Sequence, residues 1–179
     1  MPLTRPFEAR FVGRYRTKSM KRIFILLSVV LAAMAFVFAI EQGQTTAPEH
    51  KILNPSDLQW GEIPPGLPPG AKMAVLSGDP AKPGPFTARM QAPSGYIIRP
   101  HTHPTVERLT VIFGTFRVGM GDKFDEVAMR DLGPGGYVVL PAGMKHFAKI
   151  KTDAIVQIDS EGPFQINYAN PSDDPRNTK

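Results

Sequence analysis

Cysteine is absent from this sequence of 179 residues. The chain can therefore form no disulfide bond, so its folded part must be stabilised by a hydrophobic core. A lipid attached to a cysteine is excluded as a membrane anchor for the same reason.

Helical periodicity is also missing from the chain after residue 40. Short apolar runs there alternate with turns rich in glycine and proline, a pattern that predicts an all-β sandwich or barrel. The sequence contains no recognisable catalytic triad, phosphate-binding loop or paired general acid and base. None of these three kinds of active site is therefore predicted.

Positive charge is scarce outside the first 39 residues. Seven of the 21 lysines and arginines precede Ile40, and Glu8 is the only acid in that leader. Residues 40–179 hold the other 14 basic residues against 15 acidic ones, so the formal charge of +5 belongs to the leader. A nucleic-acid-binding domain needs a basic patch on its folded part, and this function is not predicted.

Residues 1–39 have the pattern of a secretory signal peptide. Lys21 and Arg22 precede Ile23–Ile40, an apolar run of 18 residues with a single polar member. A basic region followed by an apolar core and small residues is typical of such signals. Val37 and Ala39 then occupy the −3 and −1 positions, which predicts cleavage before Ile40.

An uncleaved anchor helix is the alternative, because 18 apolar residues just reach the length that spans a bilayer. In either case the basic flank stays in the cytoplasm, and the following residues are exported to the periplasm or the cell exterior. The membrane is then contacted only through this N-terminal segment. Met20, directly before the basic pair, is an alternative start to Met1.

The exported part divides into three predicted regions. Residues 40–71 are a polar tether followed by a proline-rich arm, GEIPPGLPPG at 61–70, which lies over the folded domain. Residues 72–168 form the β-domain, and residues 169–179 form a disordered tail. Phe113, Met120 and Phe147 are expected to line the interior of the domain. The predicted strands cover 72–77, 86–91, 96–99, 106–113, 116–120, 137–140, 146–150, 154–159 and 164–168, while 124–132 is a strand or a loop.

Four side chains in this domain suit a metal ion. His101, His103 and Glu107 share strand parity, so they can converge on one face of a sheet. His146 follows a Pro-Ala-Gly turn further along the chain. Three imidazoles and one carboxylate are a ligand set for a divalent transition metal, with its other positions open. We therefore predict that these four residues bind one such ion.

A His-x-His pair alone is more often a structural pair without a metal. Here, however, three of the four histidines fall in these two segments, and only His50 lies in the tether. Glu107 lies inside the apolar run VERLTVIF, where an unpaired charge would be costly. Turn residues bracket both segments. Gln157 and Asp159 are candidates for hydrogen bonds to the ligand histidines.

Residues 95–114 and 135–150 resemble the two motifs of the cupin superfamily. Nine fixed positions at fixed spacing make a specific match. The one departure is Ile150, which stands where the second motif ends in asparagine; that position is not a metal ligand in the family. The first motif, G-x5-H-x-H-x3-E-x6-G, matches Gly95, His101, His103, Glu107 and Gly114, and the second, G-x5-P-x-G-x2-H-x3-N, matches Gly135, Pro141, Gly143 and His146.

The resemblance implies an all-β cupin fold, the double-stranded β-helix or jelly-roll barrel, with one ion of Mn, Fe, Ni, Cu, Co or Zn inside. Cupins with three histidines and a glutamate include oxalate-converting enzymes and quercetin-type dioxygenases. The chain is therefore predicted to be an exported metal-dependent oxidoreductase, dioxygenase or decarboxylase-type lyase acting on a small organic molecule. A non-catalytic sensor or carrier is the alternative, and Glu107 could serve as a catalytic base instead of a ligand. The resemblance also implies pairing into a homodimer.

Overall fold

The computed structural model describes residues 50–177, so the predicted signal peptide or anchor and most of the tether lie outside the described residues. Among the described residues, no helix has the length and apolar character needed to cross a membrane. The compact unit that begins at Ile52 is all-β apart from three 3-10 helices. In chain order its elements are η1 (Pro55–Asp57), β1 (Gly61–Glu62), β2 (Lys72–Ser77), β3 (Gly84–Ala92), β4 (Ile97–Thr102), β5 (Glu107–Met120), β6 (Arg130–Leu132), β7 (Tyr137–Leu140), β8 (His146–Gly162), β9 (Asn167–Tyr168), η2 (Pro171–Asp173) and η3 (Pro175–Asn177).

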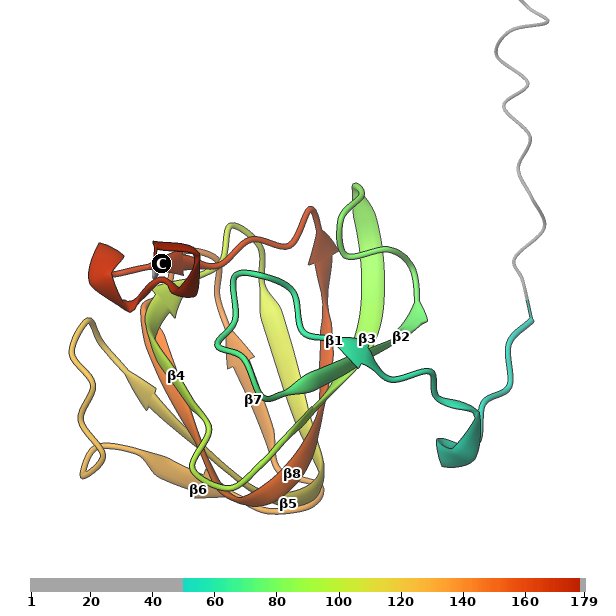
Figure 1. Ribbon diagram of the computed structural model, residues 1–179, viewed down its shortest axis with the longest axis horizontal. Coiled ribbons are helices and arrows are strands. Elements are labelled where there is room, and N and C mark those ends of the chain that lie inside the picture. Colours follow the sequence, from blue (N-terminus) through green and yellow to red (C-terminus); the bar gives the residue numbers. More distant parts are fainter. Residues whose placement is uncertain (1–49, 178–179) are drawn as a thin grey trace, which may run out of the picture. The chain divides into compact units, whose positions relative to one another are not determined.

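Two long strands, β5 and β8, organise the sheet (Figure 1). They pair antiparallel from Arg108 with Asp159 to Met120 with His146. The first part of β5 also pairs with β7, and the last part of β8 pairs with β3, which is followed by β2 and β1. The last part of β5 pairs with β6, and the first part of β8 pairs with β4, which is followed by β9. Each long strand therefore belongs to two halves of one curled, barrel-like sheet.

The sheet bends between its halves at Gly114. The register between β5 and β8 shifts three times between Val111 and Phe116. Gly114 has a φ of +77°, and a Cβ at this position would collide with the carbonyl oxygen of Asp153. Glycine is the residue that permits both this backbone conformation and this close approach.

We expect Gly114→Ala to lower the free energy of unfolding by about 2–4 kcal/mol, because alanine adds left-handed strain and a backbone collision. Denaturant titration followed by circular dichroism measures this change. Gly133→Ala is the matched control, because a Cβ at Gly133 meets no atom within 4 Å. Equal stabilities of the two variants would contradict this account of the bend.

The bend explains why several strand predictions differ from the structure. The predicted strands 106–113 and 116–120 are one strand, as are 146–150 and 154–159, because the chain passes through register shifts instead of turns. The shift after Val111 turns Phe113 outward, so that 58% of it is exposed. Met120 is also exposed, and Phe147 is buried against Phe124 and outside the main core cluster.

The proline-rich arm lies against the barrel. Gly61 and Glu62 pair with β2, and the backbone N–H of Leu67 donates to the carbonyl of Pro64 at 2.9 Å to close a tight turn. Two tyrosine hydroxyls hold the arm on either side of Leu67. Tyr96 donates to the carbonyl of Pro68 at 2.5 Å, and Tyr168 donates to that of Gly66 at 2.9 Å. The side chain of Leu67 is buried.

The residues after β9 differ from the predicted disordered tail. As far as residue 177 they form η2 and η3, each of which begins with a proline at a position that favours a helical turn. Arg176 binds the carboxylate of Asp174 and donates to the carbonyl of Ile166 at 2.9 Å. The polar composition of this segment gives no sign of these contacts.

Candidate metal centre

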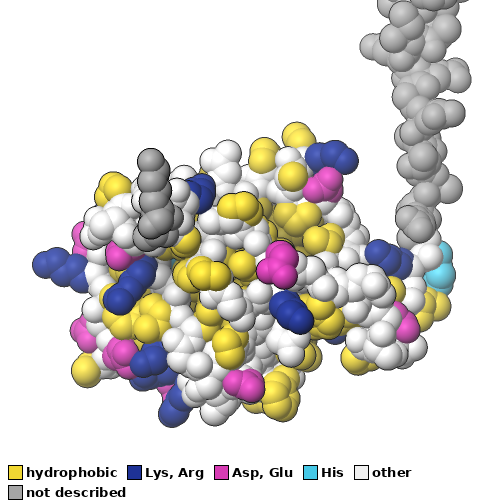
Figure 2. Space-filling view, in the orientation of Figure 1, with side chains coloured by type: hydrophobic (Ala, Val, Ile, Leu, Met, Phe, Trp, Pro, Cys, Tyr) yellow, Lys and Arg dark blue, Asp and Glu magenta, His cyan; other side chains and the backbone are white. Residues whose placement is uncertain are grey.

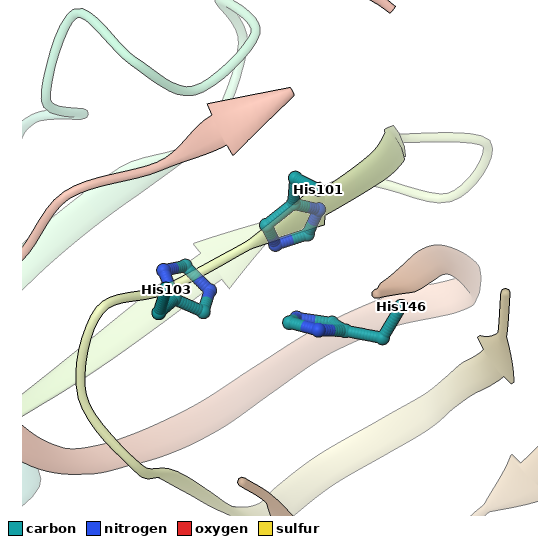
Figure 3. Close-up of side chains that lie close together, drawn as sticks. All are labelled: His101, His103 and His146. Atoms are coloured by element: carbon teal, nitrogen blue, oxygen red, sulfur yellow. The ribbon is translucent and has the colours of Figure 1, made fainter. Parts of the chain in front are cut away.

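Three histidines converge inside the barrel (Figure 3). His101 on β4 lies directly opposite His146 at the start of β8, and His103 follows β4 by one residue. All three are at least 96% buried. One ring nitrogen from each lies within 4.8 Å of the others. Two nitrogens that share an ion at about 2.1 Å are roughly 3–4 Å apart, so this spacing suits a common metal ion.

Backbone carbonyls fix the orientation of each imidazole. The Nδ1 atom of His101 lies 2.7 Å from the carbonyl of Arg99, and that of His146 lies 3.0 Å from the carbonyl of Met144. The Nδ1 atom of His103 lies 2.7 Å from the carbonyl of Gln165. A carbonyl only accepts hydrogen bonds, so each Nδ1 must carry the proton. The Nε2 atom of each neutral ring is therefore left with a free lone pair.

Two loops place His103 although it lies outside a strand. Its carbonyl accepts a hydrogen bond from the backbone N–H of Gly143 at 2.9 Å. Gly143 belongs to the Pro-Ala-Gly turn before His146 and has a φ of +73°. This bond joins the two segments that carry the histidines, because it ties the turn before His146 to the loop that carries His103.

Glu107 approaches the histidines from the other half of the sheet. It is the first residue of β5, and its Oε2 atom lies 3.4 Å from Nε2 of His103 and 3.5 Å from Nε2 of His146. The carboxylate is buried, as are all three imidazoles. The four side chains that the sequence singles out therefore form one cluster. His50, by contrast, is exposed and precedes the compact unit that begins at Ile52.

The electrostatics of the cluster favour a cation beside Glu107. Burial raises the pKa of Glu107, but the hydrogen-bonding and charge interactions with His103 and His146 outweigh it, so this pKa lies well below its usual value. Burial lowers the pKa of His103, but Glu107 outweighs burial and raises it. Burial, followed by the neighbouring histidines, lowers the pKa of His101 to about 3. His101 therefore stays neutral at physiological pH.

The cluster fits a divalent metal ion. The Nε2 atom of His103 is buried and faces the Glu107 carboxylate at 3.4 Å, so two acceptors oppose each other unless a proton or a metal ion lies between them. The nearby carboxylate needs a positive charge that either a protonated imidazole or a metal ion supplies. Three imidazole nitrogens and a carboxylate are also the donors that divalent transition metals accept. We therefore assign His101, His103 and His146 as candidate ligands, with Glu107 as the predicted fourth.

Apolar side chains surround this cluster and leave little free space. The chamber has a volume of about 30 Å³, whereas one water molecule requires roughly 10–15 Å³. Phe164 stacks on the ring of His103, with centroids 4.4 Å apart. Leu67 from the arm and Ile166 also line the chamber. The chamber therefore has room for about two water molecules at most, and its apolar walls strengthen the interaction between the carboxylate and any bound cation.

Sequence reasoning missed the groups that orient the histidines. Gln157 and Asp159 bond to Arg89, to Thr87 and to each other, and not to the histidines. The orienting groups are backbone carbonyls, which every residue type possesses and which the sequence cannot identify. Leu67 and Phe164 were missed for another reason, since an apolar residue carries no signal of proximity to a site. The sequence predicts that Phe164 begins a strand at 164–168, but the observed strand β9 covers only Asn167–Tyr168.

The fold occurs in known structures of low sequence identity. No protein-family model matches the sequence, and a search of curated proteins finds no match. The polyketide cyclase RemF of Streptomyces resistomycificus is 16% identical with a TM-score of 0.58, and the alignment covers 72% of this chain and 91% of that one. A candidate acetylacetone dioxygenase of Methylibium petroleiphilum PM1 is 16% identical with a TM-score of 0.55, covering 73% and 88% of the two chains. An RmlC-like cupin of Shewanella frigidimarina NCIMB 400 is 17% identical with a TM-score of 0.49, covering 63% and 91%.

Proposed function

This chain has the cupin fold, and from that premise we propose that it is an exported metal-dependent oxidoreductase or lyase that acts on a small organic molecule. His101, His103, His146 and Glu107 would hold one divalent transition ion of Mn, Fe, Ni, Cu, Co or Zn. Export is supported by the basic pair and the apolar run at 23–40.

One observation carries the metal-binding part of this proposal. Each histidine donates from Nδ1 to a backbone carbonyl, so three neutral Nε2 atoms are available within one buried cluster. The tautomer is thereby set before any ion binds, which reduces the ordering cost of binding. A histidine that merely fills a core also needs an acceptor for its N–H, but it does not need to converge with two others on one point.

The residues around the site have separate tasks in the proposed reaction. A bound divalent ion would supply a Lewis acid or a redox centre for a substrate oxygen. Glu107 balances the charge of that ion and fixes its position from the opposite half of the sheet. His101 remains neutral over the physiological range, so its lone pair is always available. Leu67, Phe164 and Ile166 exclude water and restrict what reaches the open side of the site.

Metal analysis of the exported protein tests this proposal. Cells expressing the full chain are fractionated, and the protein recovered outside the cytoplasm is purified and analysed for metals. We expect about one divalent transition ion per chain, and metal-dependent turnover in a screen of small organic acids, diketones and phenols. Protein retained in the cytoplasm would contradict export, and a metal-free protein that cannot be loaded would contradict the metal site.

A non-catalytic metal-binding cupin is the second candidate, and the small chamber favours it. A volume of about 30 Å³ accommodates an ion and little else, as a carrier or sensor of metal ions requires. The two functions differ in one measurement. A stoichiometric metal content without turnover of any compound in the screen would favour the carrier or sensor.

A further inference from the structure

The metal chamber is too small for an organic substrate, yet it shares a wall with a larger pocket. The second pocket has a volume of about 310 Å³ and is lined mainly by apolar side chains. Leu67, Phe164 and Ile166 line both the pocket and the chamber, as does Ile158. The first three of these residues form what we call the partition. In Figure 2, hydrophobic side chains gather in the middle of the face that the proline-rich arm crosses in Figure 1.

The two sides of the partition are held differently. On one side, the backbone N–H of Phe164 donates to the carbonyl of Pro80, and the carbonyl of Ile166 accepts from Arg176. The intervening carbonyl of Gln165 accepts from the ligand His103, so a movement there would disturb the metal site. This side is therefore tied to the ligands.

Leu67, on the other side, packs its side chain into the core, but its backbone N–H bonds only within the arm. The arm is fastened near it by the hydroxyls of Tyr96 and Tyr168, which donate to the carbonyls of Pro68 and Gly66. Gly70, with a φ of +107° and open space around it, follows at the end of the arm. Within the described part of the chain, these two part-buried bonds are the hydrogen bonds that hold residues 64–68 to the barrel, and neither involves a ligand histidine. The arm is therefore the part of the partition that can move while the ligands stay in place.

The chemistry of the pocket indicates what it binds. Its lining includes prolines of the arm, Met73 and Phe86, with Gln165 and Arg176 as the polar members. The guanidinium of Arg176 already makes two hydrogen bonds of 2.7 Å to Asp174, so its charge is compensated. Such a pocket selects a neutral, mainly apolar molecule over an anion.

We propose that residues 64–68 form a movable strap whose Leu67 closes the metal chamber. A small, neutral, mainly apolar organic molecule, such as a phenol or a ketone, binds in the adjoining pocket. It reaches the ligand histidines when Leu67 is displaced. The identity of this pocket as the substrate site rests on the proposed enzymatic function. The closure by Leu67 does not rest on that function, because it concerns access to the imidazoles whether or not a metal is bound.

Chemical labelling of metal-free protein tests the closure. Diethyl pyrocarbonate acylates accessible neutral imidazoles, and peptide mass spectrometry follows each histidine separately. In Leu67→Ala we expect labelling of His101, His103 and His146 to be about tenfold faster than in the wild type, because the partition then has a gap. Exposed His50 is an internal reference that should react at the same rate in both proteins.

Two further variants separate access from general loosening of the fold. Leu132→Ala removes a leucine that packs on the core but lines neither the chamber nor the pocket, and it should leave the labelling rates unchanged. Tyr168→Phe removes one fastening of the strap without creating a cavity, and it should increase labelling about threefold. Equal rates in the wild type, Leu67→Ala and Tyr168→Phe would overturn the closure by Leu67, as would an equal acceleration in Leu132→Ala.

Ligand binding to the pocket is tested with 4-fluorophenol, observed by fluorine NMR on metal-free protein. We expect saturable binding to the wild type and at least tenfold weaker binding to Ala81→Trp. Ala81 is an exposed residue of the pocket lining, so an indole at this position would fill the pocket. The absence of saturable binding to the wild type, or equal binding to Ala81→Trp, would overturn the pocket assignment. Failure of the metal site would appear only in the metal analysis, so the two proposals can fail separately.

Discussion

Replacing His146 with alanine is expected to lower the affinity for a divalent transition ion by at least about 100-fold, since loss of an orienting partner alone costs about 10- to 100-fold. The substitution removes one of three converging nitrogens and also leaves Glu107 with one imidazole neighbour fewer. The backbone pairing of His146 with His101 and Met120 does not depend on the side chain. Competition titration with a chromophoric chelator measures the affinity.

His50→Ala is the control for this prediction. His50 is exposed and lies outside the three-histidine cluster, so its loss should leave the affinity unchanged. Circular dichroism should show a folded β-domain for both variants. Equal metal content in the wild type and in folded His146→Ala protein would contradict the proposed site, and the enzymatic function would lose its basis.

The second large effect is a loss of stability of the metal-free protein as the pH rises. The folded pKa of His103 lies above its ordinary 6.5, so its contribution to stability is complete below 6.5 and is lost as the pH rises through the folded pKa. The folded pKa of Glu107 lies below its ordinary 4.5, so its contribution is present above 4.5 and is lost as the pH falls through the folded pKa. The pair therefore stabilises most between about pH 4.5 and 6.5.

Above that window His103 loses its proton and the buried carboxylate loses its protonated partner. We expect the free energy of unfolding of metal-free protein to fall as the pH rises through the folded pKa of His103, by about 1.4 kcal/mol for each pH unit by which that pKa exceeds its ordinary value, and a saturating divalent ion to restore it. Denaturant titrations at a series of pH values, with and without metal, measure both effects. Glu107→Gln removes the charge and should flatten the profile; a profile that is the same in both proteins would show that the pair does not set it.

The cluster of three histidines and Glu107 that we propose as a metal site was largely predictable from the sequence, because its chemistry resides in side chains at fixed spacing. Strand parity places His101, His103 and Glu107 on one strand face, which selects the right residues for the wrong reason. His101 lies on β4, His103 in the loop that follows and Glu107 at the start of β5, so that loop, and not parity, brings the three together. His146 required a second segment, and its turn is marked by proline and glycine. The prediction of an all-β barrel is confirmed for the same reason, since short apolar runs between turns leave few alternatives.

The long strands were not predictable, because glycine has two meanings in a β-sequence. The predicted strands 106–113 and 116–120 left Gly114 in a break between them, yet it lies within β5 and lets the sheet bend close to Asp153. A glycine in a tight turn and a glycine at a bend within a strand have the same local sequence. Which of the two forms depends on the strand that lies opposite. The outward side chain of Phe113 follows from this bend, since a shift of one residue moves a side chain to the other face.

The arm and the tail illustrate contacts that have no local pattern. Residues 64–68 and Arg176 both meet the segment 164–166, more than 90 residues after the arm. Their roles depend on hydroxyl-to-carbonyl and guanidinium-to-carbonyl bonds, which composition cannot predict. A proline-rich stretch indicates only that the backbone is extended and not where it lies.

The three carbonyls that orient the histidines have a consequence for how this protein can change during evolution. They belong to the backbones of Arg99, Met144 and Gln165, so no side-chain substitution at those positions deletes a hydrogen-bond acceptor. Most point mutations at these positions therefore leave the protonation of each histidine at Nδ1 unchanged. The surrounding side chains are free to diverge, which would let the range of accepted molecules drift while the capacity to hold an ion is inherited intact.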